Sequence, residues 1–162
     1  SLHGEARERF DLAALVTECV NGYRLAYPQQ AFELKAPAQP MSVEGSPDLF
    51  AQLLDKLVAN AVDFGRAGSP IRIELARAGL AVQLAVTNAG PLIPDEVRGR
   101  LFESMISARS GRSHGHDSEP HLGLGLYIAR LIAEFHGGSI AAANLPDGSG
   151  VSVRLTFPLS SG

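Results

Sequence analysis

Three segments carry residue types that could bind a phosphorylated ligand, and the first contains Asn60. Asn60 lies one turn after Lys56 in a stretch whose apolar residues repeat at helical spacing. In projection it falls at the edge of the apolar stripe, where an unpaired, half-buried amide costs roughly 1–3 kcal/mol. A neighbouring loop could satisfy this amide, or its oxygen could ligate a hard cation such as Mg²⁺. For this position alone, both interpretations stay open.

The other two segments are glycine-containing. Asn88 and Gly90 directly follow an alternating, strand-like run, and glycine lets a backbone approach a ligand closely. Gly123 and Gly125 precede a helical pattern, and N–H groups at a helix N-terminus form an anion site. Alone, each signal is weak: the first is an ordinary exit from a strand, and the second could serve close helix–sheet packing.

The elements that must position these residues begin with a helix capped by Asp11 and closed by Pro28. Residues 32–36 alternate as a strand with one buried face. Met41–Val43 is expected to be a short strand that pairs back.

A second helix should run from Pro47 to about Phe64, with Gly65 ending it. Ser46 supplies a capping hydroxyl, Pro47 occupies the first turn, and Asp48 lies near the positive end of the dipole. The remaining periodicities predict strands over 71–76, 82–87, 139–144 and 151–157, a helix from Leu124 to Phe135, and a short helix around Asp95–Phe102.

Hairpins join most of these strands, so the fold class is α+β. We expect a two-layer α/β sandwich: a mixed, mostly antiparallel sheet of about five strands with three helices on one face. Strict βαβ alternation and a GxxxxGK[ST] loop are absent from the sequence, so this is not a P-loop enzyme. The long irregular stretch over 88–122 is expected to be functional or mobile.

Composition fits one globular domain over residues 1–162, with a core over 11–159. The chain is 45% hydrophobic and 19% charged, with net charge −3, so nucleic acid is not expected as a partner. The lone Cys19 excludes an internal disulfide framework and is expected to pack. Because the sequence opens at Ser1 without a methionine, we expect a piece of a larger protein.

Taken in order, four motifs are far more specific than any one alone. They are LLDKLVANA, VTNAGPLIP, LFESM and GLGLYIARLIAEFHGG. Together they resemble the catalytic ATP-binding domain of bacterial sensor histidine kinases, and more distantly the ATPases of gyrase and mismatch repair. The resemblance covers Asp11 to Leu159 and is sharpest over Gly123–Gly138.

The resemblance implies an ATP-dependent protein-histidine kinase domain with ATP and Mg²⁺ as cofactors. The γ-phosphoryl group would pass to a histidine on a separate dimerisation domain outside this chain. No residue here is a convincing catalytic nucleophile or base, which fits a domain that positions phosphates and neutralises their charge. Further expected partners are a response regulator and, in the full-length protein, a second copy; this piece alone is compatible with a monomer. The implied location is the cytoplasmic side of an inner-membrane sensor.

The resemblance also assigns site residues. Asn60 matches a magnesium ligand, Phe64 an aromatic near the base, and Asn88 an acceptor for the adenine amino group. The base pocket would be lined by Gly90 and Ile93, a lid over about 104–120 would start at Phe102, and the phosphates would meet the backbone N–H groups of Gly123, Leu124, Gly125 and Leu126.

Four positions depart from the family pattern. Where the family usually has an Asn, this chain has Lys56, and where a basic residue often meets the phosphates it has Asp63. Asn88 replaces the usual Asp, and Leu92 replaces a Gly. Lys56 could supply the charge that Asp63 does not. A degenerate nucleotide-binding or protein-interaction module without kinase activity is therefore the alternative.

A self-contained ATPase of the same superfamily is a weaker alternative. Such an ATPase needs an acid to activate water, normally a Glu one turn before the magnesium Asn, and Lys56 occupies that position here. Asp55 is adjacent but projects about 100° away. Three histidines lie close together in the sequence, His114, His116 and His121. Their spacing could suggest metal binding, but a solvated lid is the preferred interpretation. His136 precedes two glycines at a helix C-terminus, where an imidazole sits well beside the dipole.

Overall fold

The structure is a computed structural model that describes residues 7–103 and 119–160, with side chains from 126 onward in the second range. Its helices are α1 (Leu12–Ala26), α2 (Pro47–Phe64), α3 (Asp95–Arg98) and α5 (Glu119–Phe135). Its strands are β1 (Glu8–Asp11), β2 (Phe32–Lys35), β3 (Ser42–Gly45), β4 (Ile71–Ala78), β5 (Ala81–Ala89), β6 (Ser139–Asn144) and β7 (Gly150–Pro158).

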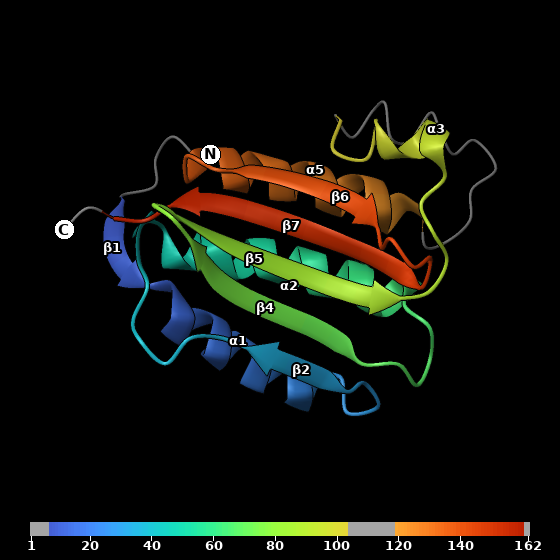
Figure 1. Ribbon diagram of the computed structural model, residues 1–162, viewed down its shortest axis with the longest axis horizontal. Coiled ribbons are helices and arrows are strands. Elements are labelled where there is room, and N and C mark those ends of the chain that lie inside the picture. The colour runs from blue at the N-terminus through green and yellow to red at the C-terminus, as the bar shows by residue number, and fades with distance from the viewer. Residues whose placement is uncertain (1–6, 104–118, 161–162) are drawn as a thin grey trace.

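The main sheet has five strands in the order β2-β4-β5-β7-β6, and α1, α2 and α5 lie behind it in Figure 1. β2 and β4 are parallel, and the other neighbours are antiparallel. The predicted mixed α+β sandwich with three helices on one face is confirmed, and so are the two predicted hairpins. The turn of the first hairpin contains Gly79 at φ +64°, a conformation that favours glycine.

A second, two-stranded sheet corrects one predicted pairing. β3 pairs antiparallel with β1 and not with the strand over 32–36, which instead pairs with β4. Met41, just before β3, lies at the start of α1: its carbonyl accepts from Leu12 N–H at 2.8 Å, and its N–H donates to Asp11 Oδ1 at 3.0 Å. These hydrogen bonds hold the residue before β3 at the start of α1, so that β3 lies beside β1 and not beside β2.

Side-chain caps fix the starts of the first two helices as the sequence predicts. Asp11 Oδ1 accepts from Ala13 N–H at 3.0 Å, and Ser46 Oγ accepts from Leu49 N–H at 3.2 Å. Caps of this kind stabilise a helix by about 1 kcal/mol each. α2 ends at Phe64, and the N–H of its C-cap Gly65 returns to Ala61 O.

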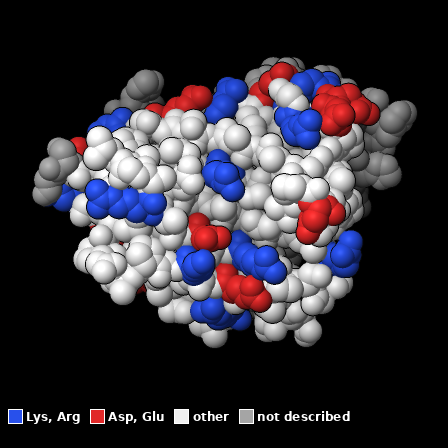
Figure 2. Space-filling view, viewed as in Figure 1, with Lys and Arg blue, Asp and Glu red and all other residues white. Residues whose placement is uncertain are grey.

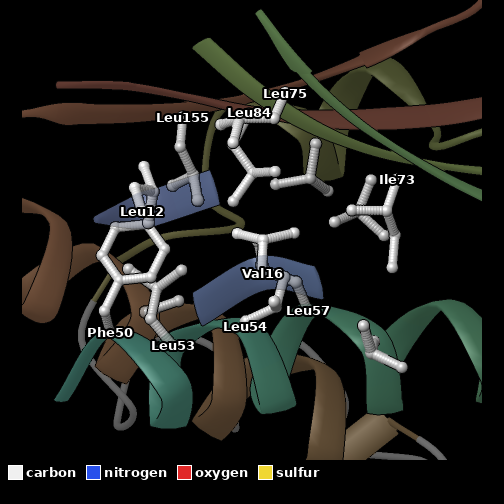
Figure 3. Close-up of a cluster of buried hydrophobic side chains, with 14 of the residues drawn as sticks. Leu12, Val16, Phe50, Leu53, Leu54, Leu57, Ile73, Leu75, Leu84 and Leu155 are labelled. Atoms are coloured by element: carbon white, nitrogen blue, oxygen red, sulfur yellow. The ribbon is translucent and has the colours of Figure 1, made fainter. Parts of the chain in front are cut away.

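The core fills the space between α1, α2 and the sheet. In Figure 3, leucines and Phe50 of α2 point toward the inward-facing side chains of the sheet, beside α1. The labelled members, all at most 2% exposed, are Leu12, Val16, Phe50, Leu53, Leu54, Leu57, Ile73, Leu75, Leu84 and Leu155. Each such side chain contributes about 1.5–3 kcal/mol when removed from water, so α2 is firmly held against the sheet.

Two helix boundaries differ from the predicted ones. α5 begins at Glu119, ahead of the expected start near Leu124, and takes in the last two residues of the segment predicted as a lid. The short helix predicted over Asp95–Phe102 ends at Arg98, and turns follow in which Arg100 N–H donates to Val97 O and Glu103 N–H donates to Arg100 O. The rest of the predicted lid, 104–118, lies outside the described residues.

Acidic and basic side chains are interspersed on the outer face of the sheet (Figure 2). Two exposed ion pairs cross from β2 to β4: Lys35 Nζ to Glu74 Oε2 at 3.8 Å and Arg72 Nε to Glu33 Oε1 at 3.2 Å. Exposed pairs of this kind contribute at most about 1 kcal/mol. Among the described residues, no helix combines the length and apolar content needed to cross a membrane.

Candidate functional site

Asn60 lies on α2 at the edge of the buried face, as predicted. Its side-chain oxygen Oδ1 is buried and has no hydrogen-bond partner within the described part of the chain. An unpaired buried carbonyl costs about 1–3 kcal/mol, and an exception of this kind in a folded protein calls for an explanation such as a bound ion. Of the two interpretations left open for this amide, pairing with a neighbouring loop is not seen for any loop within residues 7–103 and 119–160.

The end of β5 lies against the C-terminal end of α2. Asn88 is 8% exposed and faces inward, and its Nδ2 donates to Ala89 O at 3.2 Å. Arg66 N–H donates to the same carbonyl at 2.7 Å. A Cβ placed on Gly65 would lie 3.4 Å from Asn88 Cβ. The structure thus brings the region of Asn88 to the helix end that follows Asn60.

Two glycines allow this close approach. Gly90 has φ +146°, and a Cβ there would lie 2.8 Å from the carbonyl oxygen of Phe64. A Cβ on Gly150 would collide with the carbonyl oxygen of Asn88. Only glycine fits at either position without movement of the backbone. Gly90 was singled out from the sequence, whereas Gly150 was not.

Asn144, at the end of β6, contacts the predicted base-pocket residue Ile93 and was not singled out from the sequence. Its Oδ1 accepts from Ile93 N–H at 2.8 Å, and its Nδ2 donates to Ile93 O at 3.0 Å. One side chain therefore satisfies both backbone groups of Ile93. The contact joins residues 51 positions apart, so no local pattern could have revealed it.

The polar residues around Asn60 have separate environments. Lys56 is half-buried and Asp63 is exposed. Asp55 accepts a hydrogen bond from the Tyr23 hydroxyl at 2.6 Å, so it faces α1, which agrees with its predicted projection away from Asn60. Burial and this bond to Asp55 raise the pKa of Tyr23.

Cys19, close to Tyr23 on α1, packs as predicted. It is half-buried against the core, and burial together with the Asp55 charge raises its pKa to about 11. A thiol with that pKa stays protonated at neutral pH and is a poor nucleophile. Among the described residues, no group of three or more His, Cys, Asp or Glu side chains is placed to hold a metal ion.

The two predicted aromatic site residues, Phe64 and Phe102, are both half-buried. Phe64 is the last residue of α2, next to Gly90. Phe102 packs on the core beside Leu101, which is 5% exposed.

The predicted phosphate-binding residues Gly123–Leu126 lie within α5, not at its N-terminus. In an α-helix each N–H from the fifth residue onward is bonded to a carbonyl four residues earlier. The N–H groups of Gly123 and its successors are therefore used by the helix in this conformation. Leu126 is 1% exposed, so its side chain belongs to the core.

His136 is a structural residue that directly follows α5, and its ring lies beside a carbonyl of the last turn of that helix, as the sequence predicted. It is 5% exposed. Its Nδ1 lies 2.8 Å from Ile132 O, and its Nε2 accepts from Ser46 N–H at 3.1 Å. Burial lowers its pKa, so the ring is neutral and ties the end of α5 to the start of α2. A Cβ on Gly45 would collide with this ring.

Comparison with known proteins defines the class of this chain. The family model described as "Histidine kinase-, DNA gyrase B-, and HSP90-like ATPase" matches residues 45–161, well over half of the sequence. The chain therefore belongs to this ATPase family.

The relatives found point to one branch of the family. "Sensor protein CutS" of Streptomyces coelicolor is 33% identical over 156 residues, which is 94% of this chain and 36% of CutS. "Sensor-like histidine kinase SenX3" of Mycobacterium tuberculosis is 30% identical over 149 residues, which is 91% of this chain and 35% of SenX3. The chain thus spans about a third of the length of each.

Solved structures agree in fold. The catalytic domain of histidine kinase ThkA superposes with a TM-score of 0.76 at 25% identity, over 95% of this chain and 96% of that one. The mycobacterial sensor histidine kinase MprB gives 0.77 at 21% identity, over 95% and 98%. In extent and fold, this chain corresponds to the catalytic ATP-binding domain of sensor histidine kinases.

Proposed function

We propose that this domain binds Mg-ATP and donates the γ-phosphoryl group to a histidine on a separate dimerisation domain. The observation that carries the proposal is the buried Oδ1 of Asn60, which has no hydrogen-bond partner among the described residues. Amide oxygens are ligands that Mg²⁺ accepts, so the residue fits the ion. Asn60 would hold the ion through this oxygen, and the ion would supply positive charge that neutralises the phosphate oxygens.

The chain's own residues would orient the nucleotide. The Asn88 side chain, buried beside the end of α2, would accept from the adenine amino group. Gly90 and Ile93 would line the base pocket, with Phe64 and Phe102 beside it. Lys56, half-buried one turn before Asn60, would place a positive charge near the phosphates.

The phosphate-binding role of Gly123–Leu126 stays a prediction and requires a change at the start of α5. The N–H groups of Gly123–Leu126 could bind phosphate oxygens only if the turn beginning at Glu119 unwinds, so that α5 starts about one turn later. ShkA, whose full-length structure in complex with AMPPNP superposes with a TM-score of 0.77, is a related fold with a bound nucleotide analogue.

The proposed partners are the protein's own dimerisation and phospho-acceptor domain and a response regulator. They follow from the similarity to CutS and SenX3, each about three times as long as this chain. The corresponding location is the cytoplasmic side of a membrane-bound sensor. Because Asp55 is bonded to Tyr23 and Lys56 occupies the position one turn before Asn60, no carboxylate is placed there to activate water, which favours transfer over hydrolysis.

The alternative is a degenerate module that binds partners without nucleotide. The observation in its favour is the engagement of the Gly123–Leu126 N–H groups within α5.

Calorimetric titration with a non-hydrolysable ATP analogue, with and without Mg²⁺, separates the two functions. We expect magnesium-dependent binding that Asn60→Ala abolishes and that Gln52→Ala, an exposed amide on the same helix, leaves unchanged. Absence of binding by the wild-type domain at millimolar nucleotide would establish the degenerate module instead.

A further inference from the structure

The β6–β7 turn and the strand ends that flank it contact the end of β5 and the loop after it at three places. Asn144 holds both backbone groups of Ile93. The carbonyl of Ser149 accepts from Gly90 N–H at 3.0 Å. Gly150 packs so closely on the carbonyl of Asn88 that no side chain fits there.

The turn itself is internally fixed. Asp147 Oδ1 accepts from Ser149 N–H at 3.0 Å and from Ser149 Oγ at 2.6 Å, and Leu145 N–H donates to Gly150 O at 2.8 Å. The two hydrogen bonds from Ser149 lower the pKa of Asp147, so its carboxylate is charged and keeps these two bonds at neutral pH. The turn is therefore a firm support for the loop it touches.

The loop between Gly90 and α3 has few free backbone N–H donors with which it could be fixed. Pro91 and Pro94 have no N–H, and Gly90 N–H is already bonded to Ser149. Ile93 is therefore one of two remaining backbone donors between Gly90 and α3. A side-chain amide is suited to its position because it both donates and accepts.

We propose that Asn144 is a positioning residue for the base side of the nucleotide site. Asn144 acts through Ile93, because its two hydrogen bonds fix the Ile93 backbone and with it the path of residues 90–94. This segment runs from the wall of the proposed base pocket to Pro94. The Pro94 carbonyl accepts from Val97 and Arg98 N–H at the start of α3. This inference rests on the proposed nucleotide-binding function.

The test compares wild type, Asn144→Ala and Asn144→Asp by two measurements. The first is the exchange rate of the Ile93 amide proton in the free domain. The second is displacement of a fluorescent ATP analogue by ADP and by GDP. Asp keeps the acceptor for Ile93 N–H but turns the donor to Ile93 O into a second acceptor, so it should preserve part of the effect.

The matched control is Gln30→Ala. Gln30 Nε2 donates to two backbone carbonyls, Ala31 O at 3.0 Å and Ser69 O at 2.9 Å, beside β2 at the sheet edge opposite β6. This substitution also removes a side-chain amide that makes two hydrogen bonds to the backbone, but at a position outside the proposed site.

For Asn144→Ala we expect faster Ile93 exchange and ADP affinity about tenfold weaker, the effect of losing two backbone contacts. GDP affinity should fall less, so the ADP-to-GDP preference shrinks, because a loosened pocket discriminates bases poorly. Gln30→Ala should preserve this preference.

Equal losses for ADP and GDP, or an unchanged Ile93 exchange rate, would refute the positioning role. A wild-type domain that binds no adenine nucleotide would instead refute the proposed function, and this inference would fail with it. Wild-type binding together with unchanged ADP affinity in Asn144→Ala would refute this inference alone.

Discussion

Protonation of His136 is expected to weaken the fold. The ring is 5% exposed; Nδ1 donates to Ile132 O, and Nε2 accepts from Ser46 N–H. A second ring proton on Nε2 would face a backbone donor. Burial, with the charge of Arg7 adding to it, lowers the pKa of His136 from its ordinary 6.5.

The sign and limit of the effect follow from proton linkage. With the folded-state pKa depressed, the unfolded chain binds more protons as the pH falls through 6.5, so stability present at neutral pH is lost toward acid. The slope is at most about 1.36 kcal/mol per pH unit, so the loss between pH 6.5 and pH 5 is at most about 2 kcal/mol.

Urea denaturation of wild type and His136→Gln at pH 7.5 and pH 5 isolates the contribution of His136 protonation to the free energy of unfolding. Glutamine does not titrate and keeps a donor and an acceptor, and the other titrating groups are common to both chains. Wild type should lose more stability on acidification than His136→Gln, by at most about 2 kcal/mol. Equal losses would contradict the argument, as would an NMR titration of the folded-state His136 ring at or above pH 6.5.

Three further substitutions follow from the same contacts. Gly45→Ala should destabilise the domain by about 1–3 kcal/mol in urea denaturation, because its Cβ would overlap the His136 ring; stability equal to wild type would contradict this packing. Tyr23→Phe, which removes the 2.6 Å bond to Asp55, should cost about 1 kcal/mol in the same assay, since Asp55 is exposed; no cost would show that the bond contributes nothing. Lys56→Ala should weaken ATP-analogue binding several-fold, with the largest effect at low salt; unchanged affinity would refute a phosphate-facing role for Lys56.

Local sequence signals predicted the parts of the fold that depend on neighbouring residues. Ser46 and Pro47 fixed the start of α2, Gly65 fixed its end, and helical periodicity placed Asn60 at the edge of the core. Alternation identified the β4–β5 and β6–β7 hairpins, whose partners are close in sequence.

Contacts between distant residues were not predictable in this way. The pairing of β3 with β1 depends on how Met41 meets the start of α1. His136 and Ser46 are 90 residues apart, so the glycines beside His136 indicated a helix end without revealing its partner.

One missed feature did have a local signal. Glu119 and Pro120 begin α5 with an acid and a proline in the first turn, the combination that marked α2. The predicted start was later because the apolar spacing begins at Leu124 and the glycines at 123 and 125 were interpreted as an anion site at the helix N-terminus.

The most direct test of the central claim is a crystal structure of the domain with a non-hydrolysable ATP analogue and Mn²⁺ in place of Mg²⁺. Anomalous scattering locates the metal independently of the protein atoms. We predict a peak about 2.1 Å from Asn60 Oδ1, with the adenine beside Asn88. A metal that bridges the phosphates without touching Asn60, or a nucleotide bound elsewhere, would contradict the account.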